Sequence, residues 1–298
     1  MNLRVTMTWA PVGDPGALDV AVLWSDRLAG APGGPAVCIW TARAVDPPDH
    51  PAATRCCWHS LDLAPRVDRH AAHRRRDLPW SPWGTKSGPN VQFFALLDAV
   101  TALHPEEWIL YAEPDTVPLG PDAARHLSAT LAAHPDAWVI GAHPHPRVRP
   151  AVDDDLLYHL NGAALYRTGD PEFAAFRTGV WAPSLLDRVR HDPEYAYDCV
   201  TDPAQWPSLP PALAAGWRAR SARFVATAGM VNASTLTLGP DDVAGVLADP
   251  EVVAAARSEG VRPWLLHAKG PVLDAAARRD PGYEAVIAEV LGDPGPRP

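Results

Sequence analysis

The chain has 298 residues, of which 47% are hydrophobic and 20% charged, a balance typical of a folded protein. Its formal charge of −9 argues against a nucleic-acid backbone as the main partner, and no run approaches the roughly 18 apolar residues of a membrane span. Four cysteines without CxxC spacing predict neither a zinc knuckle nor a disulfide framework, and the N-terminus lacks the pattern of a secretion signal, so we expect a cytoplasmic protein.

Strands and helices alternate through the first part of the chain. Apolar and β-branched runs predict strands at 3–9, 36–41, 54–63 and 108–112, and apolar residues at helical spacing predict helices at 19–28 and 89–103. A predicted loop of about twenty residues, 64–86, carries the basic run 74–76. A loop of that length inside a domain is usually functional or mobile.

The same alternation continues to the end of the chain. Helices are predicted at 121–133, at 241–259 and at the chain end, strands at 137–141, 159–166, 223–227 and 263–267, and a mainly helical stretch broken by prolines at 170–217. No shift in composition marks a linker. We therefore predict an α/β fold with one mixed, mostly parallel sheet flanked by helices, in a single domain.

The strongest chemical signal is WILYAEPDTVPL, in which the strand at 108–112 runs into Glu113-Pro114-Asp115. Ligands of α/β folds bind at the carboxyl edge of the sheet, and strand alternation directs Glu113 and Asp115 to the same side. Two such carboxylates suit Mg²⁺ or Mn²⁺, which typically take one or two carboxylates together with phosphate oxygens. A solvated turn at the strand end is the alternative interpretation.

Only two of the 26 basic residues are lysines, Lys86 and Lys269. Lys86 stands in the segment GTKSGPN, which leads into the helix at 89–103. Free amides at a helix start, small residues and one lysine together make an anion site, although the spacing is not that of a P-loop. An ordinary loop before a proline-initiated helix is the alternative. The candidate ligand-binding residues of this segment are Lys86, Ser87, Gly88 and Asn90.

Two later segments place polar groups on predicted strands. In HLNGAALY, Asn161 offers an amide to sugar hydroxyls, and Gly162 is a glycine within a strand, which often marks the close approach of a ligand. In LLHAKG, His267 is positioned to reach a metal and Lys269 to meet a phosphate. The alternatives are a β-bulge at Gly162 and a partly buried histidine that binds nothing.

The series KSGPNVQFF, WILYAEPDTVPL, HLNGAALY and WLLHAKG resembles the glycosyltransferases of the GT-A fold. The resemblance covers 86–270 and implies a GT-A-like, Rossmann-like domain over 1–298, with a nucleotide-binding half at 1–120 and an acceptor-binding half at 121–298. It implies an enzyme that transfers a sugar from a nucleotide-diphosphate sugar to an acceptor. We expect a soluble acceptor, namely a small molecule, a peptide or a glycan.

The resemblance also implies roles for individual residues. Glu113 and Asp115 correspond to an EPD variant of the DxD motif, which holds Mn²⁺ or Mg²⁺ on the donor diphosphate, and His267 completes that metal site. The glutamate in the first position departs from the family pattern and leaves open which carboxylate ligates directly. The implied donor contacts are Lys86 and Lys269 on phosphate and Asn161 and Gly162 beside the sugar.

An inverting enzyme also needs a carboxylate that takes the proton of the acceptor hydroxyl. Asp198, in EYAYDCVTD, is the first candidate, and Glu194 and Asp155 are rivals. A retaining enzyme needs no such base.

Other patterns receive a structural interpretation. Asp153-Asp154-Asp155 follows a polar loop instead of a buried strand, and prolines flank His143 and His145, so turns are expected at both. The sequence Asn232-Ala233-Ser234 matches the N-glycosylation motif. Without a signal peptide this match is weak evidence for glycosylation. The basic run 74–76 is interpreted as a solvated face, with a flap over the diphosphate as the alternative.

Two rival functions belong to the same fold class. A sugar nucleotidyltransferase would carry a glycine-rich loop with arginine and lysine directly after the first strand, and TWAPVGDPG contains neither basic residue. A binding module that lost catalysis would bind nucleotide without consuming the donor. A metal-dependent hydrolase is a more distant third function.

Overall fold

The computed structural model describes residues 3–9, 16–28, 36–64, 81–104 and 108–292. Its strands are β1 (Leu3–Trp9), β2 (Ala36–Thr41), β3 (Cys57–Ser60), β4 (Trp108–Ala112), β5 (Thr116–Pro118), β6 (Val139–Gly141), β7 (Ala164–Tyr166), β8 (Phe224–Ala226), β9 (Met230–Thr237) and β10 (Leu265–Lys269). Its α-helices are α1 (Ala17–Leu28), α2 (Ala52–Arg55), α3 (Ser87–Leu103), α4 (Ala123–Ala133), α5 (Pro171–Phe176), α6 (Ala182–Val189), α7 (Pro211–Arg218), α8 (Asp242–Leu247), α9 (Pro250–Glu259), α10 (Pro271–Ala277) and α11 (Pro281–Leu291). Short 3-10 helices are η2 (Arg149–Ala151), η3 (Asp154–Leu156), η5 (Cys199–Thr201), η6 (Pro203–Ser208) and η7 (Ser221–Arg223), and η4 (Arg177–Trp181) is a π-helical turn.

Seven of these strands form the main sheet, in the order β3-β2-β1-β4-β7-β6-β8. Among the described strands of this sheet, β7 alone runs antiparallel to its neighbours. A smaller sheet has the order β5-β10-β9. The predicted α/β architecture, a mixed and mostly parallel sheet flanked by helices, is confirmed.

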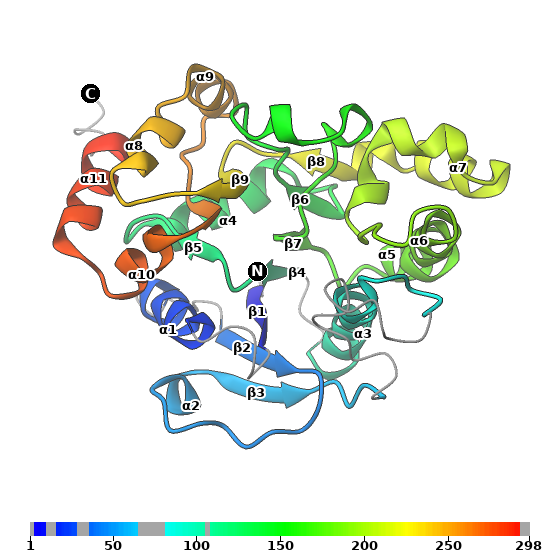
Figure 1. Ribbon diagram of the computed structural model, residues 1–298, viewed down its shortest axis with the longest axis horizontal. Coiled ribbons are helices and arrows are strands. Elements are labelled where there is room, and N and C mark those ends of the chain that lie inside the picture. Colours follow the sequence, from blue (N-terminus) through cyan, green and yellow to red (C-terminus); the bar gives the residue numbers. More distant parts are fainter. Residues whose placement is uncertain (1–2, 10–15, 29–35, 65–80, 105–107, 293–298) are drawn as a thin grey trace.

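The main sheet separates two hydrophobic cores. In β4, Trp108, Leu110 and Ala112 pack into one core, whereas Ile109 and Tyr111 pack into the other. Helices α1 and α4 contribute to the first core, and α3 and α6 to the second (Figure 1). Burial on both faces explains why this strand reads as a continuous apolar run in the sequence.

Three expected elements differ from the structure. The strand expected at 54–63 is shortened to β3, because Pro51 precedes the short helix α2 that occupies 52–55. Of the strand expected at 159–166, only Ala164–Tyr166 pairs as β7. The residues directly before β7 form a loop. The helix expected at 241–259 is two helices, because Asp249 caps a second one that begins at Pro250.

Strands β5 and β9 were not expected from the sequence. β9 contains asparagine, serine and threonine, and its second half is only partly buried, so its composition does not resemble a core strand. It pairs in parallel with β10, which pairs antiparallel with β5. The basic run 74–76 lies outside the described residues.

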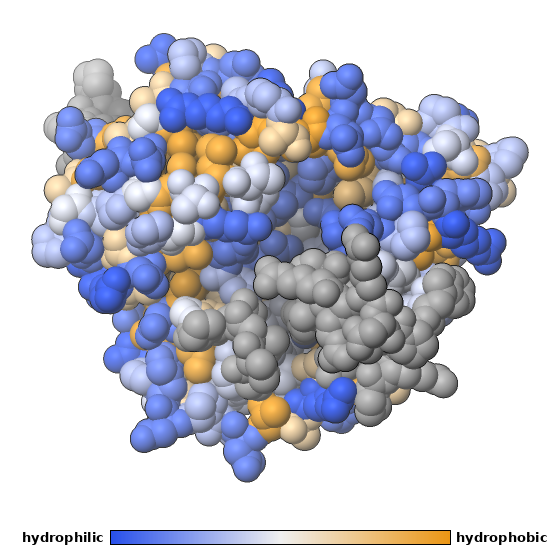
Figure 2. Space-filling view, in the orientation of Figure 1, coloured by the Kyte–Doolittle hydropathy of each residue, from blue (hydrophilic) through white to orange (hydrophobic). Residues whose placement is uncertain are grey.

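Hydrophilic residues cover most of the described surface in the view of Figure 2, and hydrophobic residues form small patches on it. Among the described residues, no helix has both the length and the apolar character that crossing a bilayer requires.

Candidate active site

A cavity of about 460 Å³ opens at the carboxyl ends of β1 and β4. Met7 of β1 pairs with Ala112 of β4, so the residues that follow them, among them Thr8 and Glu113, emerge side by side. The first turn of α1 lines the cavity, as do Gly270 and the residues of α10 that follow it. The cavity therefore lies at the sheet edge where parallel α/β folds bind ligands.

Three side chains with metal-ligating atoms meet beside this cavity: Glu113 and Asp115, which line it, and the buried His267. Nε2 of His267 lies 3.0 Å from Oδ1 of Asp115 and 3.4 Å from Oε2 of Glu113. One ligand atom from each of the three lies within 4.8 Å of the others. The unexpected strand β5 brings them together, because its Thr116 pairs with His267 of β10.

Asn161 fixes the orientation of the His267 ring. Its Oδ1 accepts a hydrogen bond from the backbone N–H of Ala163 at 2.9 Å, which identifies that atom as the amide oxygen. The same oxygen lies 2.9 Å from Nδ1 of His267, so Nδ1 must carry a proton and donate it. Nε2 is left facing the two carboxylates. Asn161, expected beside the sugar, thus holds the histidine in position.

The electrostatics of the three groups are linked. Burial raises the pKa of Glu113 to about 7, despite the opposing effect of His267. Burial disfavours the charged forms of Asp115 and His267 too, but their mutual attraction prevails, so the pKa of Asp115 falls below its ordinary value and that of His267 rises. A proton bound by Glu113 or His267 would therefore occupy atoms with which these groups would hold a cation.

Tyr197 extends the site on the side of Glu113. Its hydroxyl donates to Oε1 of Glu113 at 3.2 Å, and its ring stacks on Phe93 with the centroids 3.8 Å apart. A Cβ atom on Gly162 would lie 1.9 Å from the Tyr197 hydroxyl oxygen and 2.9 Å from Oε1 of Glu113. The sequence predicted a ligand close to Gly162, whereas in the structure these two side chains lie next to it.

Asp198 lies next to the same glycine. Its Oδ2 accepts a hydrogen bond from the backbone N–H of Gly162 at 3.1 Å, and its negative charge helps to raise the pKa of Glu113. Of its rivals, Glu194 is exposed, and Oδ2 of Asp155 accepts a hydrogen bond from Gln205. Asp198 is thus the candidate base that contacts Gly162 and acts electrostatically on Glu113.

The two lysines lie differently with respect to the cavity. Lys269 is exposed at the end of β10, and its charge contributes to the lowered pKa of Asp115, which places it close to the carboxylates. Lys86 precedes α3, and its charge acts on the thiol of Cys199, the residue after Asp198. The next residues, Ser87 and Gly88, are buried.

Asn90 has a different role from the donor contact expected of it. It is fully buried, and its Nδ2 donates to the carbonyl oxygens of Trp83 and Tyr195, both at 3.1 Å. Its Oδ1 accepts from the backbone N–H of Tyr197 at 2.9 Å. Asn90 therefore anchors the segment that carries Tyr197 and does not face the cavity.

We expect Asn90→Ala to lower the free energy of unfolding by about 3 kcal/mol, because it leaves buried backbone groups of three residues without their partner. Urea denaturation followed by circular dichroism measures this change. Asn90→Asp keeps Oδ1 but loses both donated hydrogen bonds, so it should also destabilise the fold. A change within about 0.5 kcal/mol for both variants would contradict this role.

Tyr197, Phe93 and Thr8 belong to the site but were not predicted from the sequence. The one local signal for Tyr197 is the aromatic pair in Tyr195-Ala196-Tyr197, placed in a segment rich in charged residues and prolines. Nothing in the sequence pairs it with Glu113.

The comparisons with known proteins give a consistent but distant likeness. Neither the scan against protein-family models nor the search of curated proteins finds a match. The solved structures that match include a glycosyltransferase involved in the glycosylation of the major capsid of PBCV-1 (10% identity, 94% of this chain and 98% of that one, TM-score 0.41). They also include the galactosyltransferase LgtC in complex with donor and acceptor sugar analogues (11% identity, 99% and 98%, TM-score 0.44).

A third match is glucosyl-3-phosphoglycerate synthase from Mycobacterium tuberculosis, in complex with Mn²⁺, uridine diphosphate and phosphoglyceric acid (12% identity, 88% of this chain and 79% of that one, TM-score 0.41). These three structures belong to the class of enzymes that the sequence motifs resemble. At such identities and TM-scores the likeness carries no conclusion about activity, which has to come from the geometry of the site.

Proposed function

We propose that the protein is a metal-dependent glycosyltransferase that moves a sugar from a nucleotide-diphosphate sugar to an acceptor. One observation carries the proposal: Glu113 and Asp115 line a cavity at the carboxyl edge of a mostly parallel sheet, and the buried His267 lies against both carboxylates. Its volume, about 460 Å³, falls within the range of sites that bind small molecules and cofactors.

The residues present fit a divalent cation. Two carboxylate oxygens and one imidazole nitrogen are donors that Mn²⁺ accepts readily, and Mg²⁺ accepts the carboxylates. A metal-ligating histidine usually donates its other ring N–H to a fixed acceptor, and His267 donates Nδ1–H to Asn161. Glu113, Asp115 and His267 would thus hold the ion.

A cation held there would supply the charge that stabilises a nucleoside diphosphate as it leaves. The chain's own groups provide the remaining functions. Lys269, exposed beside the carboxylates, would bind a phosphate of the donor, and the Tyr197 hydroxyl would keep Glu113 oriented. The first turn of α1 would line the donor site opposite them.

Asp198 is the group we assign to the acceptor hydroxyl if the reaction inverts configuration. The N–H of Gly162 holds its Oδ2, so Oδ1 would take the proton as the acceptor oxygen attacks the anomeric carbon. Asp198→Asn would then reduce transfer while leaving the binding of the nucleoside diphosphate intact. In a retaining reaction this substitution would have little effect on transfer, so the product's anomeric configuration has to be determined together with it.

The test is a thermal-shift panel of UDP, GDP, dTDP, CDP and ADP, each with Mn²⁺, Mg²⁺ or EDTA. One diphosphate should stabilise the protein only with metal, by about 2.7 kcal/mol at 100 times its dissociation constant. Equal stabilisation with metal and with EDTA, or no stabilisation by any of the diphosphates, would contradict the proposal. Slow consumption of the corresponding sugar donor separates a transferase from a binding module, and consumption of a nucleoside triphosphate would indicate a nucleotidyltransferase.

The affinity for Mn²⁺ should depend on pH around neutrality. A proton on Glu113, whose pKa is raised to about 7, or on His267, whose pKa is also raised, competes with the metal for the same atoms. Lowering the pH from 8 to 6 should therefore weaken binding, by about tenfold per unit for each proton displaced. Calorimetry in buffers of different ionisation enthalpy counts those protons. A dissociation constant that stays the same from pH 6 to 8 would contradict this expectation.

A further inference from the structure

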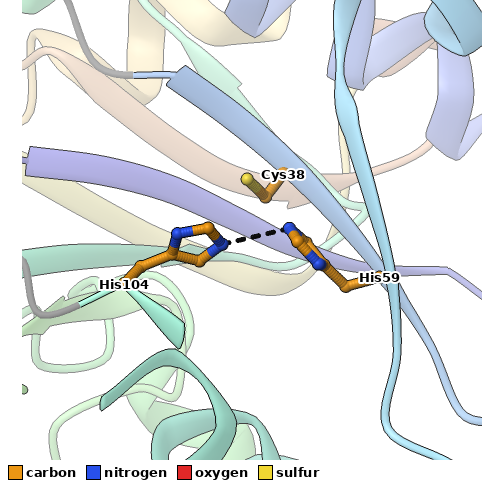
Figure 3. Close-up of side chains that lie close together, drawn as sticks. All are labelled: Cys38, His59 and His104. Atoms are coloured by element: carbon orange, nitrogen blue, oxygen red, sulfur yellow. Dashed lines mark hydrogen bonds between the residues drawn. The ribbon is translucent and has the colours of Figure 1, made fainter. Parts of the chain in front are cut away.

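A second group of metal-ligating side chains lies outside the cavity. Cys38 comes from β2, His59 from β3 and His104 from the end of α3 (Figure 3). One ligand atom from each residue lies within 4.8 Å of the others. The Nε2 atoms of the two histidines are 3.1 Å apart and point toward each other.

The register of the sheet creates this group. β2 and β3 are parallel, with Cys38 opposite Cys57 and Trp40 opposite His59. Residues two apart on a strand share a face, so both cysteines and His59 face α3, which packs over that side. The His59 ring stacks on Trp40 with the centroids 4.5 Å apart, which fixes its direction.

The distances fit a tetrahedral zinc site. With Zn–N bonds of about 2.0–2.1 Å, two ligating nitrogens are separated by roughly 3.3 Å, close to the 3.1 Å between the two Nε2 atoms. A thiolate and two imidazoles are soft and borderline donors, which select Zn²⁺ and not Mg²⁺. This donor set therefore differs in kind from the carboxylates of the cavity.

Cys57 is the neighbouring candidate for a fourth ligand, since its sulfur atom is not among the three ligand atoms that lie within 4.8 Å of one another. Its side chain is hydrogen-bonded with the Cys38 thiol, and NH1 of Arg4 donates to the sulfur atoms of Cys38 and Cys57 at 3.2 and 3.8 Å. Zinc binding ionises its thiol ligands, and a thiolate at Cys38 would offset part of the positive charge of the metal. The three grouped residues thus supply one thiolate and two imidazoles, with Cys57 next to them.

The two sites are well separated. Helix α3 runs from Pro89, which lines the cavity, to His104, so its axis places them about 22 Å apart. β3 is an edge strand of the main sheet, and His104 directly follows α3. A metal here would link β2 and β3 to α3 and would contribute to stability without touching the donor.

We propose that Cys38, His59 and His104 bind one Zn²⁺ ion that stabilises the fold, with Cys57 next to them as the candidate fourth ligand. The inference is independent of the proposed glycosyl transfer, because it uses none of the residues of the cavity.

Titration of the metal-free, full-length protein with Co²⁺ under a non-thiol reductant tests this site. Thiolate ligation produces a sulfur-to-cobalt charge-transfer band in the near ultraviolet. The cavity offers only carboxylates and an imidazole, so it cannot produce that band. We expect the band to saturate at one equivalent of Co²⁺ and to disappear when Zn²⁺ is added. Absence of the band in the wild-type protein would overturn the proposal.

The variants His59→Gln and His104→Gln should each weaken Co²⁺ binding, as followed by this band, at least tenfold. Both histidines are only partly buried, and the melting curve of each metal-free variant shows whether it folds. Cys56→Ser, next to Cys57 but outside the group, and Asp115→Asn, in the cavity, should both keep the band. Unchanged affinity in both histidine variants, or loss of the band in Cys56→Ser, would overturn the assignment.

Discussion

Asp115→Asn should lower glycosyl transfer at least a hundredfold and remove the dependence of nucleotide binding on metal. Its Oδ1 is the carboxylate oxygen closest to Nε2 of His267, at 3.0 Å, and the pKa of Asp115 is lowered, so it supplies a full negative charge at neutral pH. The amide keeps the shape of the side chain but removes that charge. Loss of one preorganised charge of this kind commonly costs a factor of about 10²–10³ in rate.

Two measurements separate the effect on chemistry from an effect on folding. Mn²⁺ affinity and turnover of the donor should both fall, whereas the melting temperature without metal should stay close to that of the wild type. Asp136→Asn is the matched control, because it removes the same charge from a side chain that is 93% exposed. An Asp115→Asn protein that binds Mn²⁺ as tightly as the wild type would refute the metal site.

The sequence predicts well those elements that the fold buries on both faces. The predicted strands 3–9, 36–41 and 108–112 match β1, β2 and β4, because central parallel strands leave continuous apolar runs. The partly polar strand β9 carries no such pattern and was missed. A prediction from local composition therefore succeeds at the centre of the main sheet and for the buried strand β10, and it misses β5 and β9 of the smaller sheet.

The same distinction applies to the candidate site. Glu113 and Asp115 are recognisable because a buried strand ends directly before them, and His267 because it ends a second apolar run. The contacts that orient these groups depend on packing between distant segments. Asn90 anchors the backbone of Tyr197, whose hydroxyl contacts Glu113, and no sequence spacing records that relation.

The zinc group shows this limit most clearly. The spacing of the four cysteines suggests no metal site, because its ligands are not arranged along one segment. They meet through the parallel register of β2 and β3, which places Cys57 opposite Cys38 and His59 opposite Trp40. Register in a sheet follows from the packing of the whole face and is not encoded in any short motif.

Gly162→Ala adds a single methyl group and should nevertheless lower both the stability of the protein and its affinity for Mn²⁺. The added Cβ would lie 1.9 Å from the hydroxyl oxygen and 2.7 Å from Cζ of Tyr197, and 2.9 Å from Oε1 of Glu113. Tyr197 is buried against Phe93 and has little room to move. We expect a loss of about 1–3 kcal/mol in the free energy of unfolding and at least a tenfold loss of Mn²⁺ affinity.

Gly179→Ala is the matched control, because nothing lies within 4 Å of a Cβ built at that glycine in the π-helical turn. Its stability should be unchanged or raised by up to about 1 kcal/mol, since alanine favours the helix over glycine. Adding Tyr197→Phe to Gly162→Ala removes the closest clash and should restore part of the lost stability, so the two changes should not be additive. Strict additivity, or wild-type Mn²⁺ affinity in Gly162→Ala, would show that the close packing of Gly162, Tyr197 and Glu113 does not control the metal site.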